Sequence, residues 1–115
     1  MVKKLCIFVS MMDSNKILSE IKNTVYGKYP DAKIILYGSR ARGDFRNDSD
    51  WDLVILLNQE KITNEIEETI TDPLYDLEIE FGEVISPMVY SKKDWNNKYS
   101  VTPFFKNVMT EGKSL

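Results

Sequence analysis

The sequence contains no histidine and only one cysteine, Cys6, among its 115 residues. Without histidine, the chain cannot use Ser-His or Cys-His catalytic pairs, and it cannot build a histidine-ligated metal centre. A single cysteine also rules out a disulfide within the chain and a zinc site made of cysteines. A metal bound by this protein would therefore have oxygen ligands, which hard ions such as Mg²⁺ prefer.

Long apolar runs are missing too, since no stretch approaches the ~20 apolar residues of a transmembrane helix. Residues 3–12 resemble a short signal peptide, but no small-residue cleavage site follows and a helical pattern begins at Asp13. We expect residues 1–12 to form a peripheral extension, either a strand or a poorly ordered segment ahead of a true start near Met11 or Met12. The expected localisation is cytoplasmic, with no membrane association.

Charge is distributed unevenly along the chain. Residues 1–42 carry a net charge of +5, residues 43–83 carry −11, and residues 84–115 carry +3. A basic segment next to an acidic one suits an anionic ligand bridged by cations, although charged helix surfaces alone would give the same pattern. No basic stripe with interleaved aromatic residues is present, so nucleic acid is not expected as the main partner.

Periodicity predicts one α/β domain over residues 1–115, with a core over 13–91 and a C-terminal helical segment over 92–115. The predicted elements are a helix from Asp13 or Ser14 to Gly27, strands over 32–37, 51–57 and 83–90, a helical stretch over 62–81, and a final helix from Thr102. The second strand is nearly all apolar and is expected to be central. Pro73 is expected to divide the helical stretch in two, and Pro87 places the third strand at an edge or a bulge.

Two aspartates, Asp50 and Asp52, flank Trp51 at the start of the second predicted strand. Residues two apart on a strand share a face, so the carboxylates lie about 6–7 Å from each other. At about 6 Å and an effective dielectric constant of about 20, two such charges repel by roughly 3 kcal/mol. Solvent or a bound cation can relieve that repulsion. An isolated Asp-x-Asp motif is most often a solvated strand end.

A Gly-Ser turn directly follows the first predicted strand. Gly38 permits close approach of the backbone, and Ser39 offers a hydroxyl and a backbone N–H at the start of a short helical turn. Arg40 and Arg42 supply forked donors suited to phosphate oxygens, although an ordinary polar loop has the same composition. Gly112-Lys113-Ser114 looks like the end of a phosphate-binding loop, but position 107 is Asn, so we expect a plain tail.

The combination of turn and aspartates is specific, because chance places Gly-Ser ten residues before Asp-x-Asp in about one chain of this length in a thousand. The motif resembles the signature of the minimal nucleotidyltransferase (MNT) domains of the DNA polymerase β-like superfamily. The residues that carry the resemblance are Gly38-Ser39-Arg40-Ala41-Arg42-Gly43 and Ser49-Asp50-Trp51-Asp52-Leu53. It implies the polymerase β-like nucleotidyltransferase fold, an α+β arrangement with a small mixed β-sheet and flanking helices.

The resemblance also implies a reaction and a set of roles. Asp50 and Asp52 would be catalytic ligands of Mg²⁺ or Mn²⁺, Gly38 and Ser39 would hold the triphosphate, and Arg42 is a weaker phosphate candidate. A nucleoside monophosphate, expected to be AMP from ATP, would pass to a protein or a small-molecule acceptor while pyrophosphate leaves.

One position departs from the family pattern. Members usually carry a third carboxylate on the next strand, and the alignment places Ser86 there. Glu83 could replace it only from a shifted register. The alternative function is therefore a catalytically weak or inactive module of the same fold that binds a nucleotide or a partner.

Small members of the family are typically paired with a HEPN-type partner protein in toxin–antitoxin modules. The resemblance thus implies a protein partner, and we expect the docking surface to include exposed apolar residues near the C-terminus, with Phe104 and Phe105 as candidates. As core residues, both rings would instead pack inside the fold.

Overall fold

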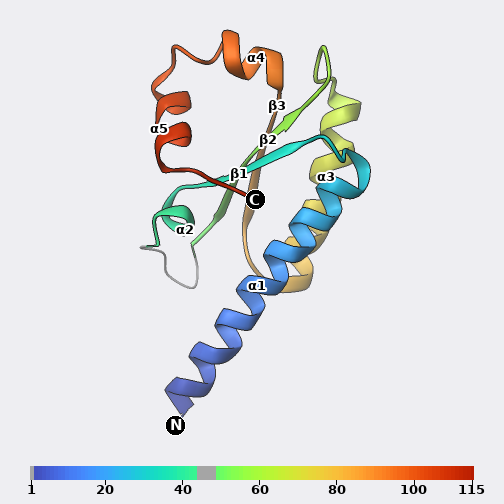
Figure 1. The fold of residues 1–115 in the computed structure, drawn as a ribbon. Helices are drawn as coiled ribbons and strands as arrows, with labels where there is room; N and C mark the ends of the chain where they lie inside the picture. Colours follow the sequence, from blue (N-terminus) through green and yellow to red (C-terminus); the bar gives the residue numbers. More distant parts are fainter. Residues whose placement is uncertain (1, 44–48) are drawn as a thin grey trace.

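The computed structural model describes residues 2–43 and 49–115, and within these ranges it describes side chains from residue 15 onward. The elements in chain order are α1 (Val2–Lys28), β1 (Lys33–Tyr37), α2 (Ser39–Arg42), β2 (Trp51–Leu57), α3 (Asn64–Phe81), β3 (Ile85–Ser91), α4 (Lys92–Asn97), α5 (Pro103–Glu111) and β4 (Lys113–Ser114) (Figure 1). Within the described ranges, no helix combines the length and apolar character needed to cross a membrane.

The strands form one mixed sheet in the order β3-β2-β1-β4. β2 pairs antiparallel with β1, from Lys33 opposite Leu56 to Tyr37 opposite Asp52, and it pairs parallel with β3. The sequence correctly predicts a small mixed sheet with flanking helices. It also correctly places the apolar strand β2 inside the sheet and β3, which contains Pro87, at an edge.

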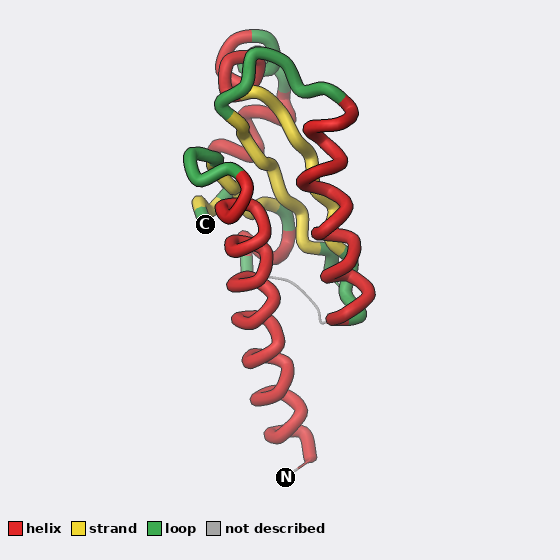
Figure 2. The backbone as a smooth tube through the Cα atoms, turned by 90° about the vertical axis from the view of Figure 1, so that its right-hand side faces the viewer, coloured by secondary structure: helices red, strands yellow, loops and turns green. Residues whose placement is uncertain are grey.

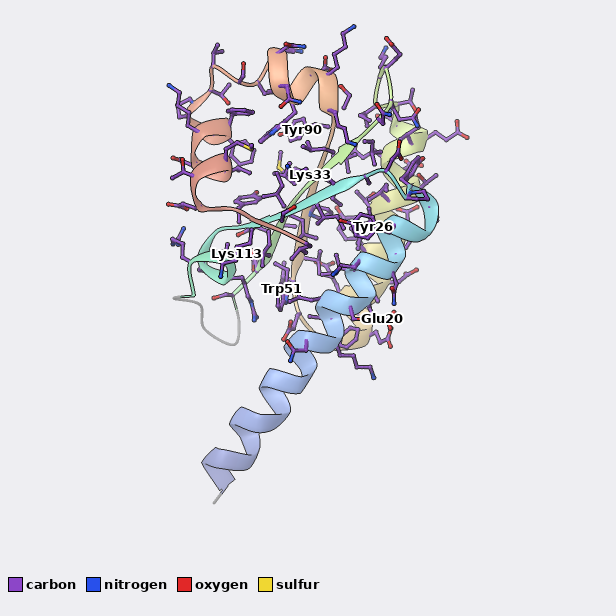
Figure 3. The ribbon with its side chains drawn as sticks, in the orientation of Figure 1. Glu20, Tyr26, Lys33, Trp51, Tyr90 and Lys113 are labelled. Carbon is purple, nitrogen blue, oxygen red and sulfur yellow. The ribbon has the colours of Figure 1, made fainter. Side chains whose placement is uncertain are left out.

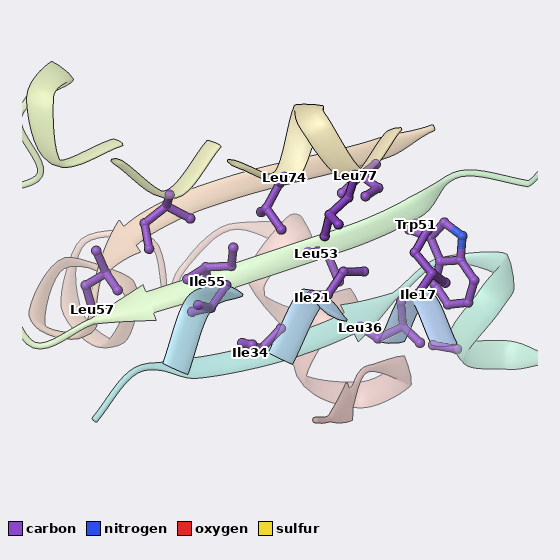
Figure 4. Close-up of a cluster of buried hydrophobic side chains, with 14 residues drawn as sticks. Ile17, Ile21, Ile34, Leu36, Trp51, Leu53, Ile55, Leu57, Leu74 and Leu77 are labelled. Atoms are coloured by element: carbon purple, nitrogen blue, oxygen red, sulfur yellow. The ribbon is translucent and has the colours of Figure 1, made fainter. Parts of the chain in front are cut away.

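One face of the sheet is covered by α1 and α3, which lie beside each other on that face (Figures 1 and 2). Alternate residues of β2 point to this side, and Leu53, Ile55 and Leu57 are fully buried. Figure 4 shows this main core between the sheet and the two helices. Its helical members at 0–1% exposure are Ile17, Ile21, Val25, Ile70 and Leu74. Each such side chain contributes roughly 1.5–3 kcal/mol by leaving water.

The opposite face carries a smaller core under α4 and α5. Ile35, Val54 and Leu56 of the sheet pack there with Trp95 and Val108. Ser91 caps α4, because the Ser91 hydroxyl accepts a hydrogen bond from the backbone N–H of Asp94 at 3.0 Å.

The two adjacent phenylalanines of α5 belong to this smaller core. Phe104 and Phe105 are half-buried, and their rings lie 5.9 Å and 5.0 Å from that of Trp95, between centroids. The expectation of an exposed apolar pair at these two positions is therefore wrong, because the rings cover Trp95. The exposed apolar side chains of this region are instead Val101 and Met109.

Both ends of the chain differ from the sequence expectation. A strand over residues 1–12 is wrong where the structure describes them, because α1 begins at Val2 and its first turns project beyond the sheet (Figures 1 and 2). No glycine or proline interrupts residues 2–26, so a helix anchored by Ile17 and Val25 extends toward the N-terminus. The expected tail is instead β4, which pairs with Ile35 and Leu36 of β1. It does so because the edge of β1 offers unpaired backbone groups.

The predicted break at Pro73 does not occur, because α3 runs unbroken through it. A proline at this position leaves the carbonyl of Thr69, four residues earlier, without its helical N–H donor. The Lys28 ammonium donates to this carbonyl oxygen at 2.9 Å from the end of α1. A contact between neighbouring helices therefore replaces the hydrogen bond that the proline removes.

This arrangement predicts a coupled pair of substitutions. Pro73→Ala should raise the free energy of unfolding by about 1–2 kcal/mol, because alanine restores the helical hydrogen bond. Lys28→Met should cost about 0.5–1 kcal/mol in the parent chain and almost nothing in the Pro73→Ala background, where a backbone N–H reaches the Thr69 carbonyl. Urea denaturation of the four proteins measures the cycle. Equal effects of Lys28→Met in both backgrounds would contradict it.

Candidate functional site

The Gly-Ser turn and the aspartate pair meet at one corner of the sheet. Antiparallel pairing places Tyr37, the last residue of β1, opposite Asp52 near the start of β2. The turn that follows β1 and the residues that lead into β2 are therefore adjacent, although ten residues separate them in the chain. Trp51 marks this end of the sheet in Figure 3, with Tyr90 near the other end.

Gly38 makes the closest approach between the two halves of the motif. Its φ of +76° lies in the region that favours glycine, and a Cβ atom there would stand 2.5 Å from Oδ2 of Asp52. The Gly38 carbonyl oxygen accepts the N–H groups of Ala41 and Arg42, both at 3.1 Å, which starts α2. Ser39 is the first residue of α2, where a backbone N–H has no acceptor within the helix.

The two carboxylates differ in environment. Asp50 is exposed and precedes β2 by one residue, whereas Asp52 is half-buried. Burial raises the pKa of Asp52, the Asp50 charge raises it further, and the Arg42 cation lowers it. A cation between the carboxylates would offset both the cost of burying the Asp52 charge and its repulsion by Asp50. The donor set, two carboxylates beside a turn rich in N–H groups, fits a hard divalent ion that also contacts an anion.

Asp52 has a hydroxyl-bearing neighbour on each side, because it pairs with Tyr37 of β1 and with Ser86 of β3. Burial raises the pKa of Tyr37, and the nearby Asp52 charge raises it further. Tyr37 has no role predicted from the sequence, although alternation along β1 places it on the face opposite to Ile34 and Leu36.

Ser86, which stands where family members usually carry a third carboxylate, pairs with Asp52 across β2 and β3. Glu83 does not replace that carboxylate. The Trp51 indole N–H donates to Oε2 of Glu83, and that oxygen lies 3.9 Å from the Arg40 guanidinium. These contacts hold Glu83 on the side of Trp51 and Ile85. Among the described residues, no group of three or more acidic, histidine or cysteine side chains could hold a metal.

The two arginines of the motif have different surroundings. Arg42 is exposed and pairs with Glu111 at the end of α5, with Nη1 and Oε2 3.1 Å apart. Arg40 is 6% exposed, and its Nε and Nη2 atoms both donate to the carbonyl oxygen of Ser49 at 3.1 Å. Its guanidinium also lies 4.1 Å from the ring centroid of Trp51. These contacts hold Arg40 inside the protein, in contrast to the phosphate-donor role that its place in the motif suggests.

Comparison with known proteins shows the family to which the chain belongs. The family model for the nucleotidyltransferase domain matches residues 18–108. The chain belongs to this family. It is 33% identical over 106 residues to the Methanocaldococcus jannaschii protein named "Putative protein adenylyltransferase MJ0604", a match that covers 90% of this chain and 99% of that protein. The resemblance to MNT domains drawn from the motif is thereby confirmed.

A solved structure also resembles the fold of this chain. The crystal structure of a mutant of the toxin-antitoxin MntA-HpeT shares the fold with a TM-score of 0.54 and 20% identity. The match covers 89% of this chain and 70% of that one. The polymerase β-like nucleotidyltransferase fold expected from the sequence is confirmed.

The glycine at the site predicts a sharp difference between two Gly→Ala substitutions. Gly38→Ala should destabilise the protein by at least about 1–2 kcal/mol, because alanine is strained at positive φ and its methyl group meets the Asp52 carboxylate. Gly27→Ala near the end of α1 meets nothing within 4 Å and should stabilise by about 0.5–1 kcal/mol. Thermal unfolding compares the two. A harmless Gly38→Ala would show that the close approach to Asp52 is unimportant.

The raised pKa of Asp52 predicts a pH-dependent stability. Ionising this carboxyl costs more in the folded chain than in the unfolded one, so the cost is absent below the ordinary aspartate pKa of about 3.9 and complete above the raised pKa. Asp52→Asn should therefore unfold at a higher temperature than the parent at pH 7 without metal, and this gain should disappear in acid. Asp72→Asn on the exposed face of α3 serves as the control. A lower melting temperature of Asp52→Asn at pH 7 would contradict the interpretation.

Proposed function

We propose that the protein is a Mg²⁺-dependent nucleotidyltransferase that moves AMP from ATP to an acceptor hydroxyl, with a protein as the preferred acceptor. The observation that carries the proposal is the contact between the Gly38 turn and Asp52, created by the pairing of Tyr37 with Asp52. It brings the Gly38–Ser39 turn and the two carboxylates to the same point. Membership of the nucleotidyltransferase family supports the same conclusion.

Each residue of the corner has a role in this proposal. The backbone N–H and hydroxyl of Ser39 would bind phosphate oxygens. Gly38 has no side chain, so the turn can lie close to the Asp52 carboxylate. Asp50 and Asp52 would hold Mg²⁺, or Mn²⁺, which supplies positive charge that offsets the charge of the phosphates. Arg42 would exchange its carboxylate partner Glu111 for a phosphate oxygen.

The transfer is a single displacement at the α-phosphorus. The acceptor oxygen forms a bond to this atom, the bond between the α-phosphorus and the bridging oxygen of the β-phosphate breaks, and pyrophosphate leaves. The acceptor proton passes to solvent, because the residue beside Asp52 where a carboxylate base would stand is Ser86.

Two comparisons favour a protein acceptor. The relative at 33% identity is named a protein adenylyltransferase, and the structural neighbour is described as a toxin-antitoxin. We propose a HEPN-type partner protein as the acceptor, with this chain as the antitoxin. Because Phe104 and Phe105 are packed against Trp95, the docking surface near the C-terminus would use the exposed Val101 and Met109 instead.

A second function is favoured by one observation, the serine beside Asp52. A site with only two carboxylates would still bind a nucleotide and a metal ion, but transfer would be slow without a base. On this alternative the protein is a nucleotide-binding or partner-binding module. Ser86→Asp separates the alternatives, because a restored carboxylate should raise transfer strongly only if its absence limits the parent.

Labelling with ATP tests the proposed function. Protein incubated with α-labelled ATP, Mg²⁺ and native-host lysate should transfer label to a polypeptide, and EDTA should stop the transfer. Asp50→Asn combined with Asp52→Asn should reduce it by at least about a hundredfold, because the site then lacks its carboxylates. Label on RNA or on a small molecule would overturn the protein acceptor. No label from the parent, with label from Ser86→Asp, would establish the weak module.

A further inference from the structure

A buried cluster joins the two halves of the site on the side away from Asp52. It consists of Arg40 from α2, the backbone carbonyl of Ser49, Trp51 at the start of β2, and Glu83 just before β3. The Arg40 side chain is 2% exposed and that of Glu83 is 21% exposed. Trp51 belongs to the main core, on the face opposite to the carboxylate of Asp52.

The contacts of Arg40 depend on the shape of a guanidinium group. Two of its nitrogens donate to one carbonyl oxygen, that of Ser49, and the flat group lies over the Trp51 ring. Glu83 compensates the buried charge and also accepts the Trp51 indole N–H. A buried cation with these partners tolerates few alternative positions, because each displacement would leave a charge or a carbonyl oxygen without its partner.

The chain positions of these partners give the cluster its significance. Arg40 directly follows Ser39, the residue that starts α2, while Ser49 directly precedes Asp50 and Trp51 separates Asp50 from Asp52. The guanidinium therefore spans from the turn to the backbone that carries both carboxylates. A shift of α2 relative to β2 would break this connection.

We propose that Arg40 is a positioning residue that holds the Gly38–Ser39 turn at a constant distance from Asp50 and Asp52, and thereby couples binding of a nucleoside triphosphate to binding of Mg²⁺. The inference rests on the proposed function and adds to it a residue that touches neither the nucleotide nor the metal. The coupling is reciprocal, so Mg²⁺ strengthens triphosphate binding by the same factor by which the triphosphate strengthens Mg²⁺ binding. Loosening the turn lowers that factor.

Calorimetry measures this factor directly. The probe is the α,β-methylene analogue of ATP, titrated with and without Mg²⁺ into the full chain, and the ratio of the two affinities is the coupling. Arg40→Lys keeps the charge but loses the forked donor, and should reduce the ratio about fivefold or more. Arg40→Met should reduce it further, and Glu83→Gln should reduce it less, since an acceptor for the Trp51 N–H remains.

Ile70→Val is the matched control. It trims a side chain that is 1% exposed in the same main core but belongs to α3, so it lowers the melting temperature and should leave the ratio unchanged. A purely structural arginine would behave like this control. Substitutions of Arg40 that lower the melting temperature and leave the ratio at its parental value would overturn the proposal.

The parent chain and the Arg40 variants answer two different questions. If the parent binds the analogue equally with and without Mg²⁺, the proposed metal-dependent function fails, and the coupling fails with it. If the parent shows the coupling and Arg40→Lys retains it, only the role of Arg40 fails. If Arg40→Met does not fold, as circular dichroism would show, Arg40→Lys and Glu83→Gln decide the outcome.

Discussion

The register between β1 and β2 is the constraint on which the rest of the structure depends. It places Tyr37 opposite Asp52, and with that pair it places the Gly38 turn against the aspartates. A slip by one residue would turn Asp52 toward the main core and Leu53 away from it. That exchange would bury a carboxylate among apolar side chains and expose a leucine that is 0% exposed. The apolar packing that stabilises the fold therefore also specifies the geometry of the site.

The two faces of the sheet carry cores of different size. The face under α1 and α3 holds the larger core and provides most of the apolar burial. The face under α4 and α5 holds the smaller core, which leaves the corner at Asp52 half-open to solvent. Arg42 and Glu111 connect that corner to the end of α5, so the C-terminal helix contributes one charge to the surroundings of the site.

The acidic charge of residues 43–83 comes mostly from the surface of α3. Seven of the acidic residues in the segment 43–83 lie on α3, and six of those are exposed on its surface. The seventh, Glu78, accepts the backbone N–H of Ile85 at 2.7 Å. Within the part of this segment that the structure describes, the acidic residues at the corner with the Gly38 turn are Asp50 and Asp52. Net charge along the chain therefore describes a helix surface more than the site, because the two aspartates are a small share of the total.

The sequence by itself determined the strands β1, β2 and β3, the inner position of β2 and the residues of the corner, because alternation, helical spacing and the Gly-Ser and Asp-x-Asp motif are local patterns. It did not show the first turns of α1 or the short strand β4. Only the tertiary structure decided how the arginines divide their roles, where Glu83 points, how Pro73 is tolerated, and which aromatic rings α5 buries. Each of these depends on contacts between segments far apart in the chain, such as Lys28 with Thr69 and Trp51 with Glu83. Local patterns specify which face a side chain shares with its neighbours, but the partner that a charged or polar group meets depends on how the elements pack.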